Sequence, residues 1–267
     1  MTLDRLPRSA RRAYPFRTAT TSFIYPADYG PNVRRLAPFF DEIELLFFEA
    51  EALPPRHVIA ELAAIGAAEG LGYNVHLPTD VSLADPDPIG RLRAVDALRR
   101  ACDHAAPLRP STFTVHVPGG PAGALDPWRE QARQGLVELA AAVGDPARMA
   151  VETLDYPPER VGELIAGLGL SVCLDVGHLL LQGRNPAAVA ARFAPVVAIV
   201  HLHAAADGRD HLALDRLPGP AAAQVLELLA GFRGVVSLEV FSFEALRDSM
   251  EWLSTRFPCG LERVPTR

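Results

Sequence analysis

Six of the eight histidines in this sequence lie within or soon after short apolar runs that resemble β-strands, and several acidic residues occupy the same kind of position. Imidazole nitrogens and carboxylate oxygens are common ligands of Zn²⁺, Mn²⁺ and Fe. A desolvated carboxylate beside neutral histidines is costly unless a cation compensates it. The pattern predicts a divalent-metal centre whose ligands are His76, His116, Glu152, Asp175, His178, His201, His211 and Glu239.

Local spacing supports this prediction. Side chains alternate between the two faces of a strand, so His201 and His203 in VHLH are expected on one face. Asp175 and His178 are separated by three residues at a strand-to-loop turn, where both can face one point. His203 is either a further ligand or the group that orients a water or a ligating carboxylate.

Each of these residues also has a structural interpretation. A strand-end histidine is often a hydrogen-bonded core residue, Asp175 can form a turn, and His211 with Asp210 can be solvated loop residues. The clustering of the whole set favours the metal centre. Glu44 alternates with apolar neighbours and can point into the core, but nothing in the sequence assigns it chemistry.

The elements that must position these residues are alternating strands and helices. Apolar, β-branched runs predict strands at 18–25, 42–48, 73–77, 113–117, 149–154, 171–175, 197–203 and 235–241, with a helical pattern after each one. Eight such units predict an α/β fold, a single-domain (β/α)₈ TIM barrel over 17–267, preceded by a flexible arginine-rich tail over 1–16. A doubly wound open sheet is the alternative. Polar residues at the carboxyl ends of barrel strands would meet at one mouth.

Composition excludes several classes of function. A net charge of −6 argues against a broad nucleic-acid surface, and three widely spaced cysteines indicate free thiols. Free thiols indicate a reducing compartment, so we expect a cytoplasmic protein. Neither a signal peptide nor a membrane span is readable, and the expected partner is a small-molecule substrate. The dinucleotide-binding, P-loop and serine-hydrolase motifs are missing. The sequence does not indicate an oligomeric state.

The pattern resembles the xylose isomerase-like TIM barrels, which join sugar isomerases and epimerases to the endonuclease IV group. The likeness rests on the motifs VHLP and VHVP, VETLD, CLDVGHLLLQG, VHLH with RDHLAL, and SLEVF. It implies a single-metal site of the isomerase type at Glu152, Asp175, His201 and Glu239. It also implies that His76, His116, His178 and His211 are the additions of the endonuclease IV type, which holds two or three ions.

One position departs from this resemblance. The acid that the endonuclease IV group places two residues before the loop histidine is Arg209 here, with Asp210 adjacent. The departure puts a third ion in doubt and leaves Arg209 free to contact a substrate phosphate.

A closer likeness is to the cobamide-remodelling phosphodiesterases. It rests on TTSFIYPADYGPNVRRLAPFFDEIELLFFE, CLDVGHLL and HLHAAADGRDH. This resemblance implies a corrinoid as the small-molecule substrate.

The leading hypothesis is therefore a hydrolase that cleaves a phosphodiester with two or three ions of Zn, Mn, Fe or Co. Glu152, Glu239 and His203 are its candidate catalytic residues, and Arg209 and Tyr25 its candidate substrate-binding residues. The alternatives are a sugar isomerase or epimerase with one ion, a corrinoid- or metal-binding module without catalysis, and a DNA-repair endonuclease, which the acidic charge disfavours.

Overall fold

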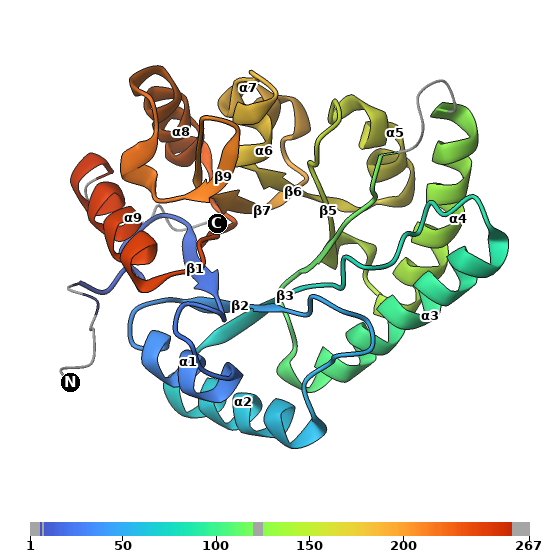
Figure 1. The fold of residues 1–267 in the computed structure, drawn as a ribbon, viewed down its shortest axis with the longest axis horizontal. Coiled ribbons are helices and arrows are strands. Elements are labelled where there is room, and N and C mark those ends of the chain that lie inside the picture. Colours follow the sequence, from blue (N-terminus) through green and yellow to red (C-terminus); the bar gives the residue numbers. More distant parts are fainter. Residues whose placement is uncertain (1–5, 7, 120–124, 258–267) are drawn as a thin grey trace, which may run out of the picture.

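Eight parallel strands close into a barrel in the computed structural model, which describes residues 6, 8–119 and 125–257 (Figure 1). Their order around the barrel is β1-β10-β7-β6-β5-β4-β3-β2. The closed order confirms the TIM barrel and rules out the open sheet. The barrel strands are β1 (Arg17–Thr21), β2 (Glu42–Leu46), β3 (Gly72–His76), β4 (Phe113–Val115), β5 (Met149–Glu152), β6 (Ser171–Asp175), β7 (Val197–Leu202) and β10 (Val235–Leu238).

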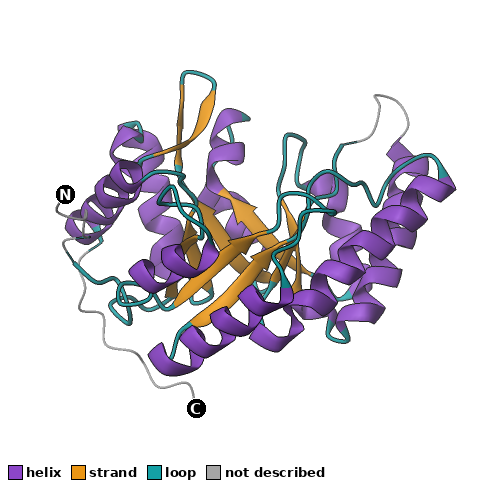
Figure 2. Cartoon of the chain, turned by 60° about the horizontal axis from the view of Figure 1, so that its bottom comes forward, coloured by secondary structure: helices purple, strands orange, loops and turns teal. Residues whose placement is uncertain are grey.

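Helices surround the strands on the outside (Figure 2). Several begin at a polar cap: the side chains of Asp87, Asn185 and Ser242 accept hydrogen bonds from amides in the first turns of α3, α7 and α9. The helices are α1 (Tyr29–Leu36), α2 (Arg56–Glu69), α3 (Pro88–Ala105), α4 (Leu125–Val143), α5 (Glu159–Leu168), α6 (Val176–Leu181), α7 (Pro186–Phe193), α8 (Gly219–Gly231) and α9 (Phe243–Arg256), with short 3₁₀ turns at Ala106–Leu108, Pro146–Arg148 and Leu214–Arg216.

Strand alternation separates the core from the site. Outward-facing residues such as Val200 and Leu202 join the large apolar cluster between strands and helices. Inside the barrel, a small separate cluster contains Ala19, Ala150, Cys173, Ile199 and Val235. Residues two positions further along these strands are polar, for example His201 after Ile199. The barrel interior is therefore apolar in one layer and polar in the next.

Two elements were not foreseen from the sequence. One is α6, which begins directly after β6 and is only six residues long. The other is a hairpin of β8 (Ala204–Ala206) and β9 (Arg209–Leu212) in the stretch expected to be a loop. Its two turn residues, Asp207 and Gly208, have φ of 53° and 72°, as a type I′ turn requires.

Part of the segment predicted to be a flexible tail packs against the barrel. Tyr14 and Phe16 are buried and stack with ring centroids 5.2 Å apart. The Ser9 hydroxyl donates to Pro38 O at 2.9 Å, and Arg11 Nη2 donates to Glu69 O at 2.6 Å. Residues 1–5, 7 and 258–267 lie outside the described part of the chain. Among the described helices, none combines the length and apolar character needed to cross a membrane.

Candidate metal centre

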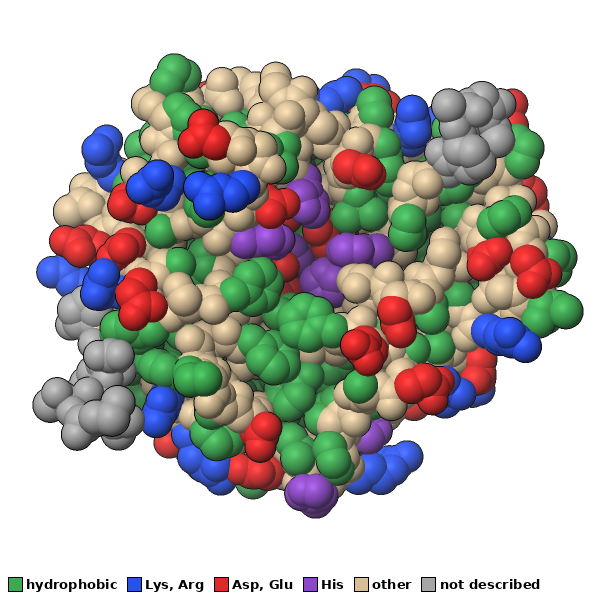
Figure 3. Space-filling model, in the orientation of Figure 1, with side chains coloured by type: hydrophobic (Ala, Val, Ile, Leu, Met, Phe, Trp, Pro, Cys, Tyr) green, Lys and Arg blue, Asp and Glu red, His purple; other side chains and the backbone are tan. Residues whose placement is uncertain are grey.

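Histidine and acidic side chains gather at the centre of one face of the molecule (Figure 3). They come from the carboxyl ends of β3 to β7 and β10 and from the segments that follow these strands. This is the end at which the fold builds its active sites. All eight predicted ligands and His203 take part in the close contacts described below. The other two histidines, His57 and His104, lie in α2 and α3.

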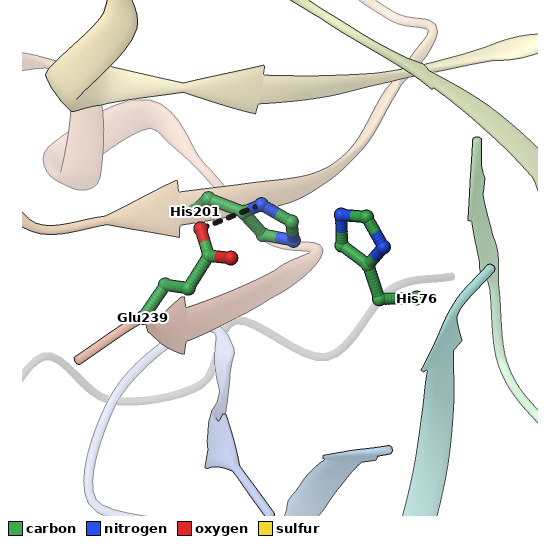
Figure 4. A group of neighbouring side chains, drawn as sticks. All are labelled: His76, His201 and Glu239. Carbon is green, nitrogen blue, oxygen red and sulfur yellow. Dashed lines mark ion pairs between the residues drawn. The ribbon is translucent and has the colours of Figure 1, made fainter. Parts of the chain in front are cut away.

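The inner group surrounds His201, whose side chain is fully buried. Its Nδ1 lies 3.0 Å from Glu239 Oε2, 3.8 Å from Glu152 Oε2 and 4.0 Å from Asp175 Oδ2. Figure 4 shows His201, Glu239 and His76 facing a common point. Nδ1 of His201 and Oε2 of Glu239 are close but form no hydrogen bond with correct geometry, and each is a buried polar atom without a hydrogen-bond partner. A cation between these donors would satisfy both atoms, so the residues fit a metal ion.

A second group shares Glu152. The Nε2 atoms of His76 and His116 lie 3.1 and 3.0 Å from the same carboxylate oxygen, Glu152 Oε2. His76 Nδ1 lies 3.0 Å from Leu77 O, a carbonyl that can only accept a hydrogen bond. In a neutral ring this contact leaves the lone pair on Nε2, on the side of Glu152. The arrangement suits an ion bound by two imidazoles and one carboxylate.

His203 is buried beside Asp175 and is oriented from both sides. Its Nδ1 accepts a hydrogen bond from the His211 amide at 2.8 Å, so the proton of a neutral ring is on Nε2, which lies 3.0 Å from Asp175 Oδ2. Asp175 Oδ1 accepts from the His178 amide and caps α6. A Cβ on Gly177 would lie 2.0 Å from His203 Cε1, so this close approach requires glycine.

The outer group is His178, Asp210 and His211, whose candidate ligand atoms lie within 4.8 Å of one another. His178 Nδ1 donates to Thr153 O at 3.0 Å, and its Nε2 lies 3.7 Å from Asp210 Oδ2. His211 has a φ of 50°, a conformation rare for residues other than glycine and often found at functional sites. The contact with His178 Nε2 places Asp210 on the side of the histidines, whereas the neighbouring Arg209 is exposed.

The buried charges shift each other's pKa values. Burial opposes ionisation of Glu152 and Glu239, but nearby histidines outweigh it, so the pKa of Glu152 is well below its usual value and that of Glu239 falls to about 2. Burial also opposes protonation of His76, but Glu152 outweighs it and raises the pKa of His76 to about 9. The carboxylates therefore stay ionised. Their negative charge favours either protonated histidines or bound metal ions beside them.

Sequence reasoning missed Glu44. Its Oε1 lies 2.8 Å from His201 Nε2, and its Oε2 accepts a hydrogen bond from Ser237 Oγ at 2.6 Å. The signal in the sequence was an acid at an alternating position of an otherwise apolar strand. The Cys173 thiol also lies near His201 and Glu152. Burial raises the pKa of this thiol, which keeps it neutral.

Part of the surface beside the histidines is apolar. We call Phe23, Phe48 and Phe241, which follow the adjacent strands β1, β2 and β10, the aromatic arc. Phe48 and Phe241 are 49% and 42% exposed. The ring of Phe23 contacts Phe48, and the ring of Phe241 lies 5.0 Å from that of His211. Figure 3 shows hydrophobic side chains beside the histidines.

The two predicted substrate-binding residues are an exposed arginine and a half-buried tyrosine. Arg209 is on the exposed end of the β8–β9 hairpin. The ring of Tyr25 lies 5.8 Å from that of Phe243 and 4.7 Å below the Arg35 guanidinium. Their role in binding a substrate stays a prediction.

Comparison with known proteins gives one family. Residues 35–256 match the family described as xylose isomerase-like TIM barrel. None of the curated proteins compared with the chain matches it. The structure is similar to that of a D-tagatose 3-epimerase-like protein, with 20% identity, a TM-score of 0.77 and coverage of 90% of this chain and 97% of the other.

Two further structures illustrate the range of reactions found on this fold. The 3-keto-D-glucoside 4-epimerase of E. coli is 18% identical with a TM-score of 0.69, and endonuclease IV of Thermus thermophilus is 19% identical with a TM-score of 0.68; each covers 90% of this chain and 99% of its own. Sugar epimerases predominate among the similar structures. At these identities the similarity establishes only the fold.

Proposed function

This chain belongs to the xylose isomerase-like TIM barrel family, and within that family we propose that it is a metal-dependent enzyme that hydrolyses a phosphodiester. Known proteins of this fold include epimerases and an endonuclease, so an enzymatic role is the common expectation. The choice of hydrolysis rests on the donor set of this chain itself.

One observation carries the proposal: the mouth holds more donors than one ion can use. Zinc takes about four ligands. The inner group already supplies one imidazole and three carboxylates, from His201, Glu152, Asp175 and Glu239. His76 and His116 add two imidazoles beside Glu152, and the outer group adds two more imidazoles and Asp210.

These residues would have different roles in phosphodiester cleavage. When bound, two or more divalent ions supply the positive charge that polarises a phosphoryl oxygen, activates a water and stabilises the leaving oxygen. Glu152 would be a metal ligand, because the rings of His76, His116 and His201 all face its Oε2. His203 would hold Asp175 in place through Nε2.

The surroundings of the metal groups support a substrate with an organic, partly apolar group. The aromatic arc borders the histidines and exposes two phenylalanines. A net charge of −6 does not favour duplex DNA. Arg209 would contact the phosphate and Tyr25 the organic group. A corrinoid is the narrower proposal for that group, and it comes from the sequence resemblance.

The second candidate is a sugar isomerase or epimerase, which the predominance of epimerases among similar structures favours. In that reaction Glu152 and Glu239, both near His201 Nδ1, would exchange a proton at a carbon beside a carbonyl. One ion at the inner group would suffice. His76, His116 and the outer group would then have no metal to bind.

Metal content and two assays separate the candidates. We expect two or three ions per chain in untreated protein, together with cleavage of bis(p-nitrophenyl) phosphate that chelator abolishes and added Zn²⁺, Mn²⁺ or Co²⁺ restores. One ion per chain, with exchange of solvent deuterium into a ketohexose and no phosphodiester cleavage, would replace the proposal by the epimerase. Tight metal binding with neither reaction would leave a binding module.

A further inference from the structure

We propose that Glu44 is a positioning residue, which holds the His201 ring so that Nδ1 faces the inner metal group and Nε2 carries the proton. Glu44 contacts none of the reacting atoms in this assignment. It would act through His201, by a hydrogen bond that crosses the inside of the barrel. The inference deepens the proposed function, since it rests on the inner group binding a metal ion.

The position of Glu44 in the barrel makes this contact specific. Glu44 is on β2 and His201 on β7, which β1 and β10 separate in the barrel order. Both side chains point inward and are fully buried, and Glu44 Oε1 lies 2.8 Å from His201 Nε2. Ser237 pairs in register with His201 and donates its hydroxyl to Glu44 Oε2 at 2.6 Å. The two carboxylate oxygens are thus directed to two neighbouring strands.

Hydrogen-bond chemistry then fixes the tautomer. An ionised carboxylate only accepts hydrogen bonds, so the proton of a neutral His201 ring lies on Nε2 and the lone pair on Nδ1. Nδ1 is the atom that faces Glu239, Glu152 and Asp175. A carboxylate behind a ligating histidine fixes the ring and increases its basicity, and loss of such a partner commonly lowers metal affinity.

Glu42 offers an internal comparison. It lies two residues earlier on the same face of β2 and is also buried. Its carboxylate pairs with Arg17 and accepts hydrogen bonds from Ser111 at 2.7 Å and Asn74 at 3.2 Å. None of these partners is a predicted metal ligand, so the contacts of Glu42 have a structural role only. Glu44 instead meets a predicted ligand.

The test uses the full-length, metal-free protein and measures affinity rather than turnover. Co²⁺ and Zn²⁺ dissociation constants are determined by competition with a chelator for wild type, Glu44→Gln, Glu42→Gln and His201→Ala. Glu44→Gln keeps the shape and removes the charge, and we expect it to weaken binding at the inner group by about 10- to 100-fold. Glu42→Gln should leave the affinity unchanged. Nitrogen-15 NMR of the metal-free protein at a pH where the ring is neutral should show His201 protonated on Nε2 in wild type and a mixture of tautomers in Glu44→Gln.

The outcomes distinguish the two proposals. If His201→Ala weakens metal binding and Glu44→Gln does not, the positioning role is wrong while the metal centre stands. If His201→Ala leaves every dissociation constant unchanged, the inner metal group itself is wrong. Should Glu44→Gln fail to fold, Ser237→Ala removes the hydrogen bond that orients Glu44. It must then weaken metal binding in the same direction by a smaller factor, and unchanged affinity in this variant would overturn the inference.

Discussion

Asp175 Oδ2 and His203 Nε2 lie 3.0 Å apart in the fully buried floor of the mouth, and the missing side chain of Gly177 is what allows them to meet. Gly177 belongs to the first turn of α6, which Asp175 caps through its other oxygen. Asp175 is therefore the last residue of β6 and the N-cap of α6, and its carboxylate also faces the inner metal group.

Gly177→Ala is expected to destabilise the protein by about 1–3 kcal/mol, because its Cβ would collide with the His203 ring. The displaced ring would also release Asp175 and lower metal affinity. Urea unfolding and chelator competition measure the two effects. Gly167→Ala on α5, where a Cβ meets nothing within 4 Å, is the matched control and should be neutral or slightly stabilising. Equal behaviour of the two variants would contradict the prediction.

Glu152→Gln should lower phosphodiester cleavage by about 10²- to 10⁴-fold. The substitution replaces the carboxylate that His76 and His116 both face by a neutral amide. Both neighbouring metal groups would therefore lose a charged ligand. Initial rates and metal content report the change. The exposed Glu163→Gln on α5 serves as control. Turnover of Glu152→Gln at the wild-type rate would remove Glu152 from the mechanism.

Asp210→Asn should reduce the metal content by one ion per chain and leave the inner group loaded. Asp210 supplies the only carboxylate of the outer group as we define it, facing His178 and His211. Elemental analysis after gel filtration measures the loss. Asp207→Asn, in the turn of the same hairpin, is a control because asparagine tolerates its positive φ of 53°. Wild-type metal content in Asp210→Asn would show that the outer group holds no ion.

The metal-free protein should lose stability as pH rises from about 6.5 to about 9. His76 has a pKa raised to about 9 in the folded state, against a usual value of about 6.5, and both of its ring nitrogens face acceptors, Leu77 O and Glu152 Oε2. Protonation therefore favours the fold fully below about pH 6.5, and this contribution disappears as pH rises through the folded pKa. Urea unfolding across this range measures it. Metal-loaded protein should respond less, since an ion replaces that proton. Rising stability of the metal-free protein would contradict the prediction.

Phe241→Ala should raise the KM for bis(p-nitrophenyl) phosphate by about tenfold, because an apolar contact with an aryl group is lost. Metal content and kcat should stay near the wild-type values. Leu92→Ala, an exposed apolar residue on α3, is the control. An unchanged KM would show that the aromatic arc does not bind the organic group.

Much of the fold was predictable from the sequence. All eight barrel strands occur where β-branched runs predicted them, although most end one to four residues earlier than expected. Strand ends depend on where the closed ladder stops, which no local pattern encodes. The hairpin escaped prediction although Asp207-Gly208 is a strong turn signal, because its strands are only three and four residues long. Burial of Tyr14 and Phe16 depends on surfaces that form only in the folded chain.

The sequence by itself determined which residues meet at the mouth. Strand alternation and the common direction of parallel strands bring His76, Glu152, His201 and Glu239 to one end, whatever the details of packing. Only the tertiary structure decided how they pair. Barrel closure and the stagger of its strands place Glu44 against His201, 157 positions away, and the hairpin turns Asp210 rather than Arg209 toward His178. Periodicity follows from local sterics, whereas pairing across a barrel depends on the register of distant strands.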